Sequence, residues 1–213
     1  MTEAAVRKIF DDPVQASAGA RIVSQLGVED TPELRSKADV PGKHEITLLV
    51  VAMGALNKKA MRQLLAMGAS PDRRSSGGES PMSLAAGAED QEFLQVLLHA
   101  GGNPNLRKRG DEPISFVAVS QRRWKNLAIL VDNGADLNAT DVAGNTVLHY
   151  LGRLGEFGPI PALIERGANF RKGDRGGVTL GDLVLSSRVN PASPQGAARE
   201  RVRELLVARG GMR

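Results

Sequence analysis

The sequence predicts an all-α fold in which helix–turn–helix units stack into a solenoid. Four segments end in the same way, with an apolar pair, a glycine and a small polar turn. Their glycines lie 33 residues apart, at Gly68, Gly101, Gly134 and Gly167. A fixed interval of this length indicates a repeat array. Aromatic residues make up only 3% of the chain, so Leu, Ala, Val and Ile must build the core, which suits thin, stacked helices.

Residues 144–173 show how one unit is expected to fold. Thr146 can cap a first helix that runs to about Leu154, because its side-chain oxygen can accept from the otherwise unpaired N–H groups of the first turn. A glycine-containing break follows, and Pro159 suits the first turn of a second helix. Gly167 then ends that helix. One unit is therefore two short helices followed by a loop that leads to the next unit.

The other units fit this pattern with two departures. Unit three is expected to carry one extra residue around Ser120–Arg122. Unit five carries about ten, since Gly210 lies 43 residues after Gly167. We assign the surplus of unit five to a loop at 186–200, which contains Pro, Ser and Gly. The helix-capping positions of the five units are then Thr47, Ser80, Glu112, Thr146 and Thr179.

From about residue 45 to residue 213, the period and the turn pattern resemble the ankyrin repeat family, whose units contain a T-P-L-H-x-A phrase. Thr146 and His149 occupy the two ends of T-P-L-H, although no unit has the whole phrase. The resemblance implies an ankyrin-repeat solenoid whose units project loops or short β-hairpins. It also implies a structural hydrogen-bonding role for His149. The repeats are expected at about 45–77, 78–109, 110–143, 144–176 and 177–213, within a domain spanning 44–213.

Both ends of the array are expected to carry caps, because a terminal unit needs a polar outer side. Residues 1–43 are interpreted as a helical N-terminal cap and connector, with a helix over 16–26. Residues 199–209 are interpreted as a C-terminal cap, with an apolar stripe on one helix face. The stripe consists of Val202, Leu205 and Leu206, and the charged residues that fall largely outside it are Arg199, Glu200, Arg203 and Glu204.

Composition and motifs favour a non-enzymatic protein in the cytoplasm. The chain has no cysteine and a formal charge of +4, and it lacks both the apolar run of a signal peptide and the ~20 apolar residues of a membrane span. The histidines, His44, His99 and His149, fall at different repeat positions. No nucleophile elbow, phosphate-binding loop or metal-ligand spacing is present. The sequence therefore predicts no catalytic residue, no cofactor, no metal and no membrane association.

The ankyrin resemblance implies that a partner protein binds at the tips of the loops and at exposed positions late in each first helix, on a concave surface. Trp124, the only tryptophan, lies among basic residues in QRRWKN (121–126). It is interpreted either as an exposed contact residue or as a ring that folds onto its own repeat. The candidate partner-binding residues are Arg74, Ser76, Glu79, Arg107, Arg109, Asp111, Val119, Ser120, Trp124, Thr140, Val142, Asn145, Arg153, Leu154, Arg175 and Val178.

The loops carry mostly positive charge with one acidic interruption. Their formal charges are +1 over 70–78, +2 over 103–111, −2 over 136–144 and +2 over 169–177. This row favours a partner protein with an acidic patch, since charge complementarity sets association rate and specificity. The alternative is that these charges only keep the exposed loops solvated.

The leading functional hypothesis is a protein–protein interaction scaffold that is monomeric when unbound. Small ankyrin proteins resembling this one occur in bacteria beside toxins or effectors, so an immunity protein that neutralises a cognate toxin is the specific candidate. An effector adaptor that binds host proteins is the alternative. Nucleic-acid binding is a third class, which the scarcity of aromatic residues and the acidic loop of repeat three disfavour.

Overall fold

The computed structural model describes residues 47–75 and 78–212, which contain five pairs of α-helices. The first helices of the pairs are α4 (Leu48–Gly54), α6 (Pro81–Ala86), α8 (Ile114–Ser120), α10 (Val147–Leu154) and α12 (Leu180–Ser186). The second helices are α5 (Lys58–Ala66), α7 (Gln91–His99), α9 (Trp124–Asp132), α11 (Ile160–Glu165) and α13 (Pro194–Ala208). One pair falls in each predicted repeat range. The predicted N-terminal cap at 1–43, His44 and the candidate residue Ser76 lie outside the described residues.

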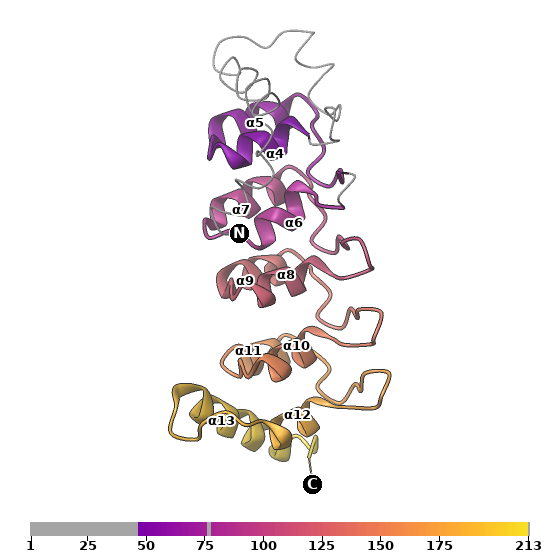
Figure 1. Ribbon diagram of the computed structural model, residues 1–213, viewed down its shortest axis with the longest axis vertical. Helices are drawn as coiled ribbons and strands as arrows, with labels where there is room; N and C mark the ends of the chain where they lie inside the picture. The colour runs from indigo at the N-terminus through magenta and orange to yellow at the C-terminus, as the bar shows by residue number, and fades with distance from the viewer. Residues whose placement is uncertain (1–46, 76–77, 213) are drawn as a thin grey trace.

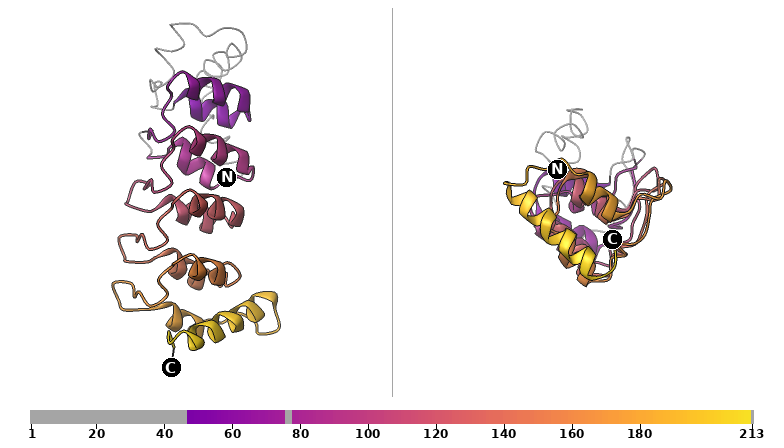
Figure 2. Two further views of the ribbon diagram at one scale, coloured as in Figure 1. Left: turned by 180° about the vertical axis from the view of Figure 1, so that it is seen from behind. Right: turned by 90° about the horizontal axis from the view of Figure 1, so that it is seen from below.

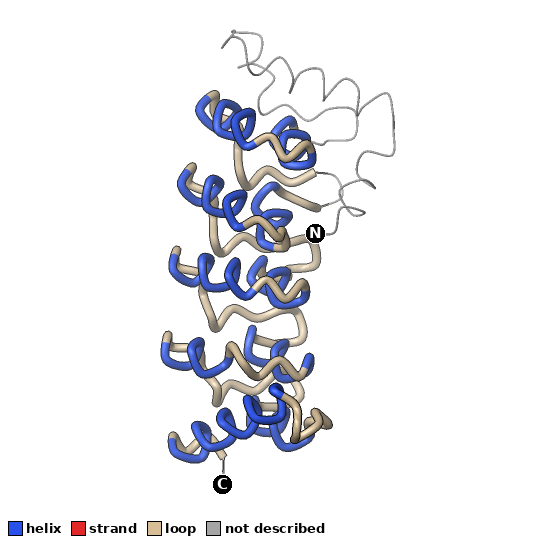
Figure 3. Tube along the Cα trace, turned by 90° about the vertical axis from the view of Figure 1, so that its left-hand side faces the viewer, coloured by secondary structure: helices blue, strands red, loops and turns tan. Residues whose placement is uncertain are grey.

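The helix pairs stack along one axis and form an elongated solenoid (Figures 1 and 2). The first helices make one row and the second helices another (Figures 1 and 3). The loops between units extend beyond the row of first helices (Figures 1 and 2). Within 47–75 and 78–212 no strand forms, and the isolated β-bridge found there joins Arg107 and Pro113. The predicted all-α solenoid is confirmed, and its described units project loops rather than β-hairpins.

The first helices begin at regular positions. Their N-caps are Thr47, Ser80, Pro113, Thr146 and Thr179, each 33 residues after the previous one. The predictions of Glu112 as the third cap and of an extra residue around Ser120–Arg122 were therefore wrong. Pro113 has the extended backbone of a cap, with φ −60° and ψ 140°, but it makes no side-chain hydrogen bond. Residues are predicted as N-caps because a side-chain oxygen can accept a hydrogen bond, and proline has no such oxygen, so Pro113 was not predicted as a cap.

The false insertion arises in the loop that leads into unit three, where Gly110 stands one position earlier than the glycines of the other loops. Asp111 has φ +63°, and its N–H donates to the Lys108 carbonyl at 3.1 Å. In the next loop, Gly144 has φ +82° and donates in the same way to Asp141 at 3.0 Å. Asp111 therefore fills the position that glycine holds there. Aspartate is among the few residues besides glycine that tolerate this left-handed conformation.

A column of leucines runs through the core of the solenoid. The second helix of each described unit buries a leucine at an equivalent position. These leucines are Leu64, Leu97, Leu130, Leu163 and Leu206. Burying a leucine side chain contributes about 1.5–3 kcal/mol relative to leaving it exposed. Three first helices bury an alanine at a common position, Ala52, Ala85 and Ala118. Because the alanine side chain is small, it lets the neighbouring helices pack closely without a void.

Polar side chains in the loops also join neighbouring units. Asn105 accepts the N–H of Asp136 at 2.7 Å and donates to the Gly134 carbonyl at 2.9 Å. One period later, Asn138 makes the equivalent contacts at 2.7 and 3.3 Å. Because each amide satisfies backbone groups of the following unit, these contacts fix the spacing between units as well as stabilising the loops.

His149 links units four and five from inside the stack. Its buried ring accepts the Thr146 N–H at Nδ1 (3.1 Å) and donates from Nε2 to the Val178 carbonyl (2.9 Å). A carbonyl can only accept, so Nε2 carries the hydrogen. The structural role that the resemblance implied for His149 is confirmed by these contacts.

The last unit ends in α13, which has 15 residues and is the longest described helix. Because α13 begins at Pro194, the predicted loop at 186–200 was too long, and 187–193 alone connects the two helices. Gln195, in the additional first turn, donates to Glu156 Oε2 at 2.8 Å and accepts the Phe157 N–H at 3.1 Å. The additional turn thus anchors unit five to unit four.

The far end of α13 has the polarity expected of a cap. Val202 and Leu206 are buried, and Leu205 is half-buried. Arg203 is exposed and forms an ion pair with the half-buried Glu200. The charged pair therefore lies outside the buried face of the helix.

Candidate functional site

The loops and the exposed ends of the first helices form one continuous side of the solenoid, here called the inner surface (Figure 1). Each loop is closed by one backbone hydrogen bond at the same repeat position. The donor N–H groups belong to Ser75, Lys108, Asp141 and Asp174, and the acceptor carbonyls to Glu79, Glu112, Asn145 and Val178. The predicted tip residues therefore lie in equivalent turns. Arg74, Arg109, Asp111, Val142 and Arg175 are exposed, whereas Glu79, Arg107, Thr140, Asn145 and Val178 are half-buried.

Two of the predicted basic contacts bind the protein itself. The guanidinium of Arg74 donates to the Arg107 carbonyl in the next loop, and Arg107 donates in turn to the Thr140 carbonyl. Arg107 also pairs with Asp111 at 2.6 Å. These arginines connect three successive loops, so their charge is less available to a partner than the formal count implied.

Much of the remaining loop charge has a partner within the chain. Lys108 pairs with Glu79 at 3.3 Å, and Arg153 pairs with Asp174 at 2.6 Å. Arg175 is exposed, and its side chain makes no hydrogen bond or ion pair within the described part of the chain. The positive character of the loops therefore depends on fewer residues than the sequence suggested.

The loops that lead into units four and five are each organised around a half-buried aspartate, Asp141 and Asp174. Asp174 accepts the N–H groups of Gly176 (2.8 Å) and Val178 (3.0 Å) as well as Arg153. Burial acts to raise the pKa of Asp174, but the two N–H donors and the guanidinium outweigh it and hold the pKa below its ordinary value. The pKa of Asp141 is lowered in the same way against burial, chiefly by Asn145 and by the Ala143 N–H.

We expect the stabilising effect of Asp174 to disappear in acid. A lowered folded pKa means that the ionised carboxylate stabilises the native state above its unfolded pKa of 3.8. That contribution is lost as the pH falls through the folded value. Asp174→Asn should be less stable than the wild type at pH 7, and the gap should close below about pH 4. Urea unfolding midpoints over a pH series measure this, and a gap that is constant with pH would contradict it.

The helix ends contribute different residues from those predicted in repeat three. Val119 is fully buried and cannot touch a partner, so its prediction as a contact was wrong. The supposed extra residue shifted the register by one; the residues equivalent to Arg153 and Leu154 are Ser120 and Gln121, which are exposed. In repeat two the equivalent residues, Gly87 and Ala88, are buried, and neither has a large side chain that could contact a partner.

Two large apolar side chains stand out on the inner surface. Val142, in the loop between Asp141 and Asn145, is 58% exposed, and Leu154 at the end of α10 is 48% exposed. Exposed apolar side chains set among polar ones are a common feature of protein interaction sites.

Trp124 lies apart from the inner surface. It begins α9, in the row of second helices, where it is half-buried against the core. The half-buried ring agrees with the second interpretation, in which Trp124 folds onto its own repeat.

A groove of ≈ 420 Å³ opens between the C-terminal ends of α10 and α12 and the loop after α12. Arg153 and Leu154, both predicted contacts, line it. Leu183 of α12 lines it as well, and so do Arg188 and Val189. Sequence reasoning missed the last two because they fall in the surplus of unit five, which was interpreted only as an unpatterned loop. The groove brings two predicted residues together with a segment that repeat alignment cannot place.

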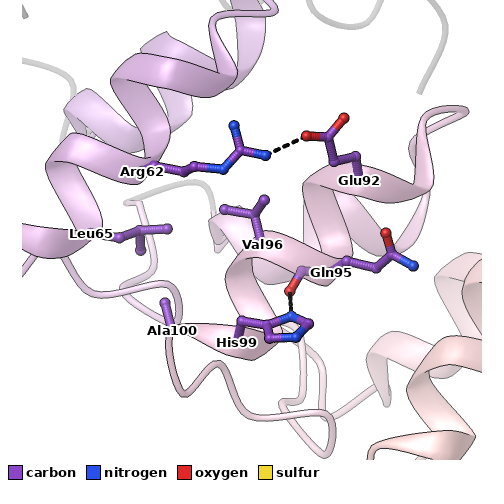
Figure 4. A pocket seen from close by; sticks show the side chains of 7 residues that line it. All are labelled: Arg62, Leu65, Glu92, Gln95, Val96, His99 and Ala100. Carbon is purple, nitrogen blue, oxygen red and sulfur yellow. Dashed lines mark hydrogen bonds and ion pairs between the residues drawn. The ribbon is translucent and has the colours of Figure 1, made fainter.

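A second groove, of ≈ 470 Å³, lies between the second helices α5 and α7 (Figure 4). Leu65 lies on one side of it, and an ion pair between Arg62 and Glu92 connects the two helices. His99 Nδ1 binds the Gln95 carbonyl at 2.7 Å. None of these residues was predicted, and the groove lies away from the loops, so it is not part of the inner surface.

Metal-binding clusters and membrane-spanning helices are both absent from the described residues. Residues 47–75 and 78–212 contain no group of three His, Asp or Glu side chains arranged to hold a metal ion. No helix in the same residues is long and apolar enough to cross a membrane.

Comparison with known proteins supports the interpretation of the repeats. Residues 48–141 match the family model for ankyrin repeats, in three copies. No curated protein matches the chain. The match covers α4 to α9, and the same helix pair, cap spacing and loop closure continue through the two units that follow. Residues 48–141 are therefore ankyrin repeats, and the two units that follow them have the same architecture.

Proposed function

We propose that this protein is a non-enzymatic scaffold that binds a partner protein through its inner surface. Ankyrin repeats generally mediate protein–protein interaction. The observation that carries the proposal is the exposure of Val142 and Leu154 on the same side of the solenoid as the loops. Burying such side chains against a partner supplies the apolar centre that a specific interface needs.

The proposed mechanism is rigid presentation. The loops are tied to one another by Arg74, Arg107, Asn105 and Asn138, so their relative positions are set before a partner arrives. Ordering loops on association costs free energy, and a surface that is already ordered avoids that cost. No catalytic step is assigned to any residue.

The partner is proposed to carry an acidic patch, with a smaller contribution from the loops than their formal charge suggests. Arg175 is the loop residue best placed to bind an acidic patch, because its side chain forms no ion pair within the described part of the chain. Toxin neutralisation in the cytoplasm by a monomeric protein remains our specific hypothesis, and binding of host proteins by a secreted adaptor remains the alternative.

Capture of the partner and two matched double variants test the proposal. Full-length chain is used to capture proteins from its source cells, and affinity for the captured protein is measured by calorimetry. Val142→Glu with Leu154→Glu should weaken binding by about tenfold or more, because both apolar contacts become buried charges.

The control makes the same chemical change elsewhere. Ala128→Glu with Val207→Glu replaces two exposed apolar residues of the second helices α9 and α13, and it should bind like the wild type. Equal losses in both double variants, or none in the first, would reject the inner surface as the binding site.

A further inference from the structure

The groove between α10 and α12 has a wall that the other units lack. Repeat five contains the additional loop 187–193, and residues of this loop line the groove beside α12. Leu154 and Leu183 come from the two first helices, and Val189 comes from the loop. The groove thus has apolar side chains on three sides.

The additional loop is held in place by the chain around it. Arg199 donates to the Ser187 carbonyl at 3.1 Å, and the Val189 N–H donates to Ser187 Oγ at 3.3 Å. At the other side Val189 packs so closely on Gly155 that a Cβ there would lie 2.8 Å from its methyl group. Gly155 also has φ +72°, which favours glycine. The wall is therefore formed in the absence of a partner.

The two cations beside the groove differ in what they already bind. Arg153 pairs with Asp174, whose carboxylate balances its charge. Arg188 is exposed, and its side chain makes no hydrogen bond or ion pair within residues 47–75 and 78–212. Among the described residues, no acidic side chain lines the groove. A ligand that brings a carboxylate beside Arg188 would complete the charge balance, since a guanidinium binds carboxylates through paired N–H groups.

We propose that this groove is the specificity pocket of the inner surface and receives a partner segment in which an acidic residue adjoins a leucine-sized apolar residue. The apolar side chain packs against Leu154, Leu183 and Val189, and the carboxylate binds Arg188. The inference rests on the proposed function and adds to it the chemistry of the segment that is recognised.

Methyl NMR of the full chain tests this inference without a known partner. The probe is an N-acetylated, C-amidated peptide Gly-Ser-Leu-Glu-Asp-Leu-Ser-Gly, compared with its amide form, in which Gln and Asn replace Glu and Asp. The acidic peptide should shift the methyl signals of Leu154, Leu183 and Val189 in a saturable way. The amide peptide should bind about tenfold more weakly, because the guanidinium then lacks a charged partner.

A matched pair of charge reversals assigns the effect to one residue. Arg188→Glu should weaken binding of the acidic peptide by about tenfold, whereas Arg201→Glu, an exposed residue of α13 outside the groove lining, should leave it unchanged. Equal binding of the two peptides, or full binding by Arg188→Glu, would overturn the inference. If the captured partner is lost from the Val142/Leu154 variant but not from Arg188→Glu, the proposed function stands and the pocket assignment fails.

Discussion

Leu130→Ala is expected to lower the free energy of unfolding by about 2–5 kcal/mol. Leu130 is fully buried in α9, at the middle of the leucine column that passes through all five described units. Removing its side chain forfeits the burial of the missing atoms and leaves a cavity that the stacked helices can only partly close. Each unit of a solenoid is stabilised by its neighbours, so a defect in the third unit weakens the contacts on both sides.

Denaturant unfolding followed by circular dichroism measures this loss. Val207→Ala, at an apolar position that is 49% exposed, is the control and should change stability by less than about 0.5 kcal/mol. If Leu130→Ala unfolds at the wild-type midpoint, the leucine column does not hold the units together.

Asn126→Asp is expected to cost roughly 3–5 kcal/mol at neutral pH, although the two side chains have nearly the same shape. Asn126 lies in α9 and is only 1% exposed. Its Nδ2 donates to the carbonyls that end α6, those of Ala85, Ala86 and Ala88, at 3.1, 3.1 and 2.8 Å. Aspartate would replace this shared donor with a second acceptor and would place an unpaired charge against three carbonyl oxygens.

The pH dependence of Asn126→Asp distinguishes this cause from a general packing defect. Burial beside carbonyl oxygens raises the pKa of the introduced carboxyl, because it disfavours the charged form. Once protonated, the carboxyl can donate one hydrogen bond, so the stability gap to wild type should narrow as the pH falls from 7 towards about 5. Asn133→Asp, at the exposed end of the same helix, should cost under about 1 kcal/mol. A gap for Asn126→Asp that is independent of pH would contradict the proposed hydrogen-bonding role.

The architecture could be predicted from the sequence because each unit repeats the same local rules. Thr146, Pro159 and Gly167 specify the start and end of two helices, and α10 ends at Leu154 as predicted. In the loop that leads into repeat three the glycine is displaced by one position, and Asp111 adopts the positive φ that glycine adopts in the other loops. This displacement caused the error in the predicted register. That one-residue error placed the buried Val119 on the surface.

The candidate site was harder to predict because its chemistry depends on contacts between units. Arg107 looks like a free cation in the sequence, and only the stacking of the loops shows that it donates to the Thr140 carbonyl. Arg188 was not considered, because the repeat pattern assigns no place to residues in an additional loop. Formal charge therefore overestimated the basic character of the loops, and the groove beside Arg188 could not be anticipated.

Hydrogen–deuterium exchange of the full chain, free and bound to its captured partner, tests the binding account most directly. We expect slowed exchange in the loop at 141–145 and at the C-terminal ends of α10 and α12, with exchange in the second helices α7 and α9 unchanged. If exchange slows only in the second helices and is unchanged on the inner surface, the partner binds the opposite side of the solenoid.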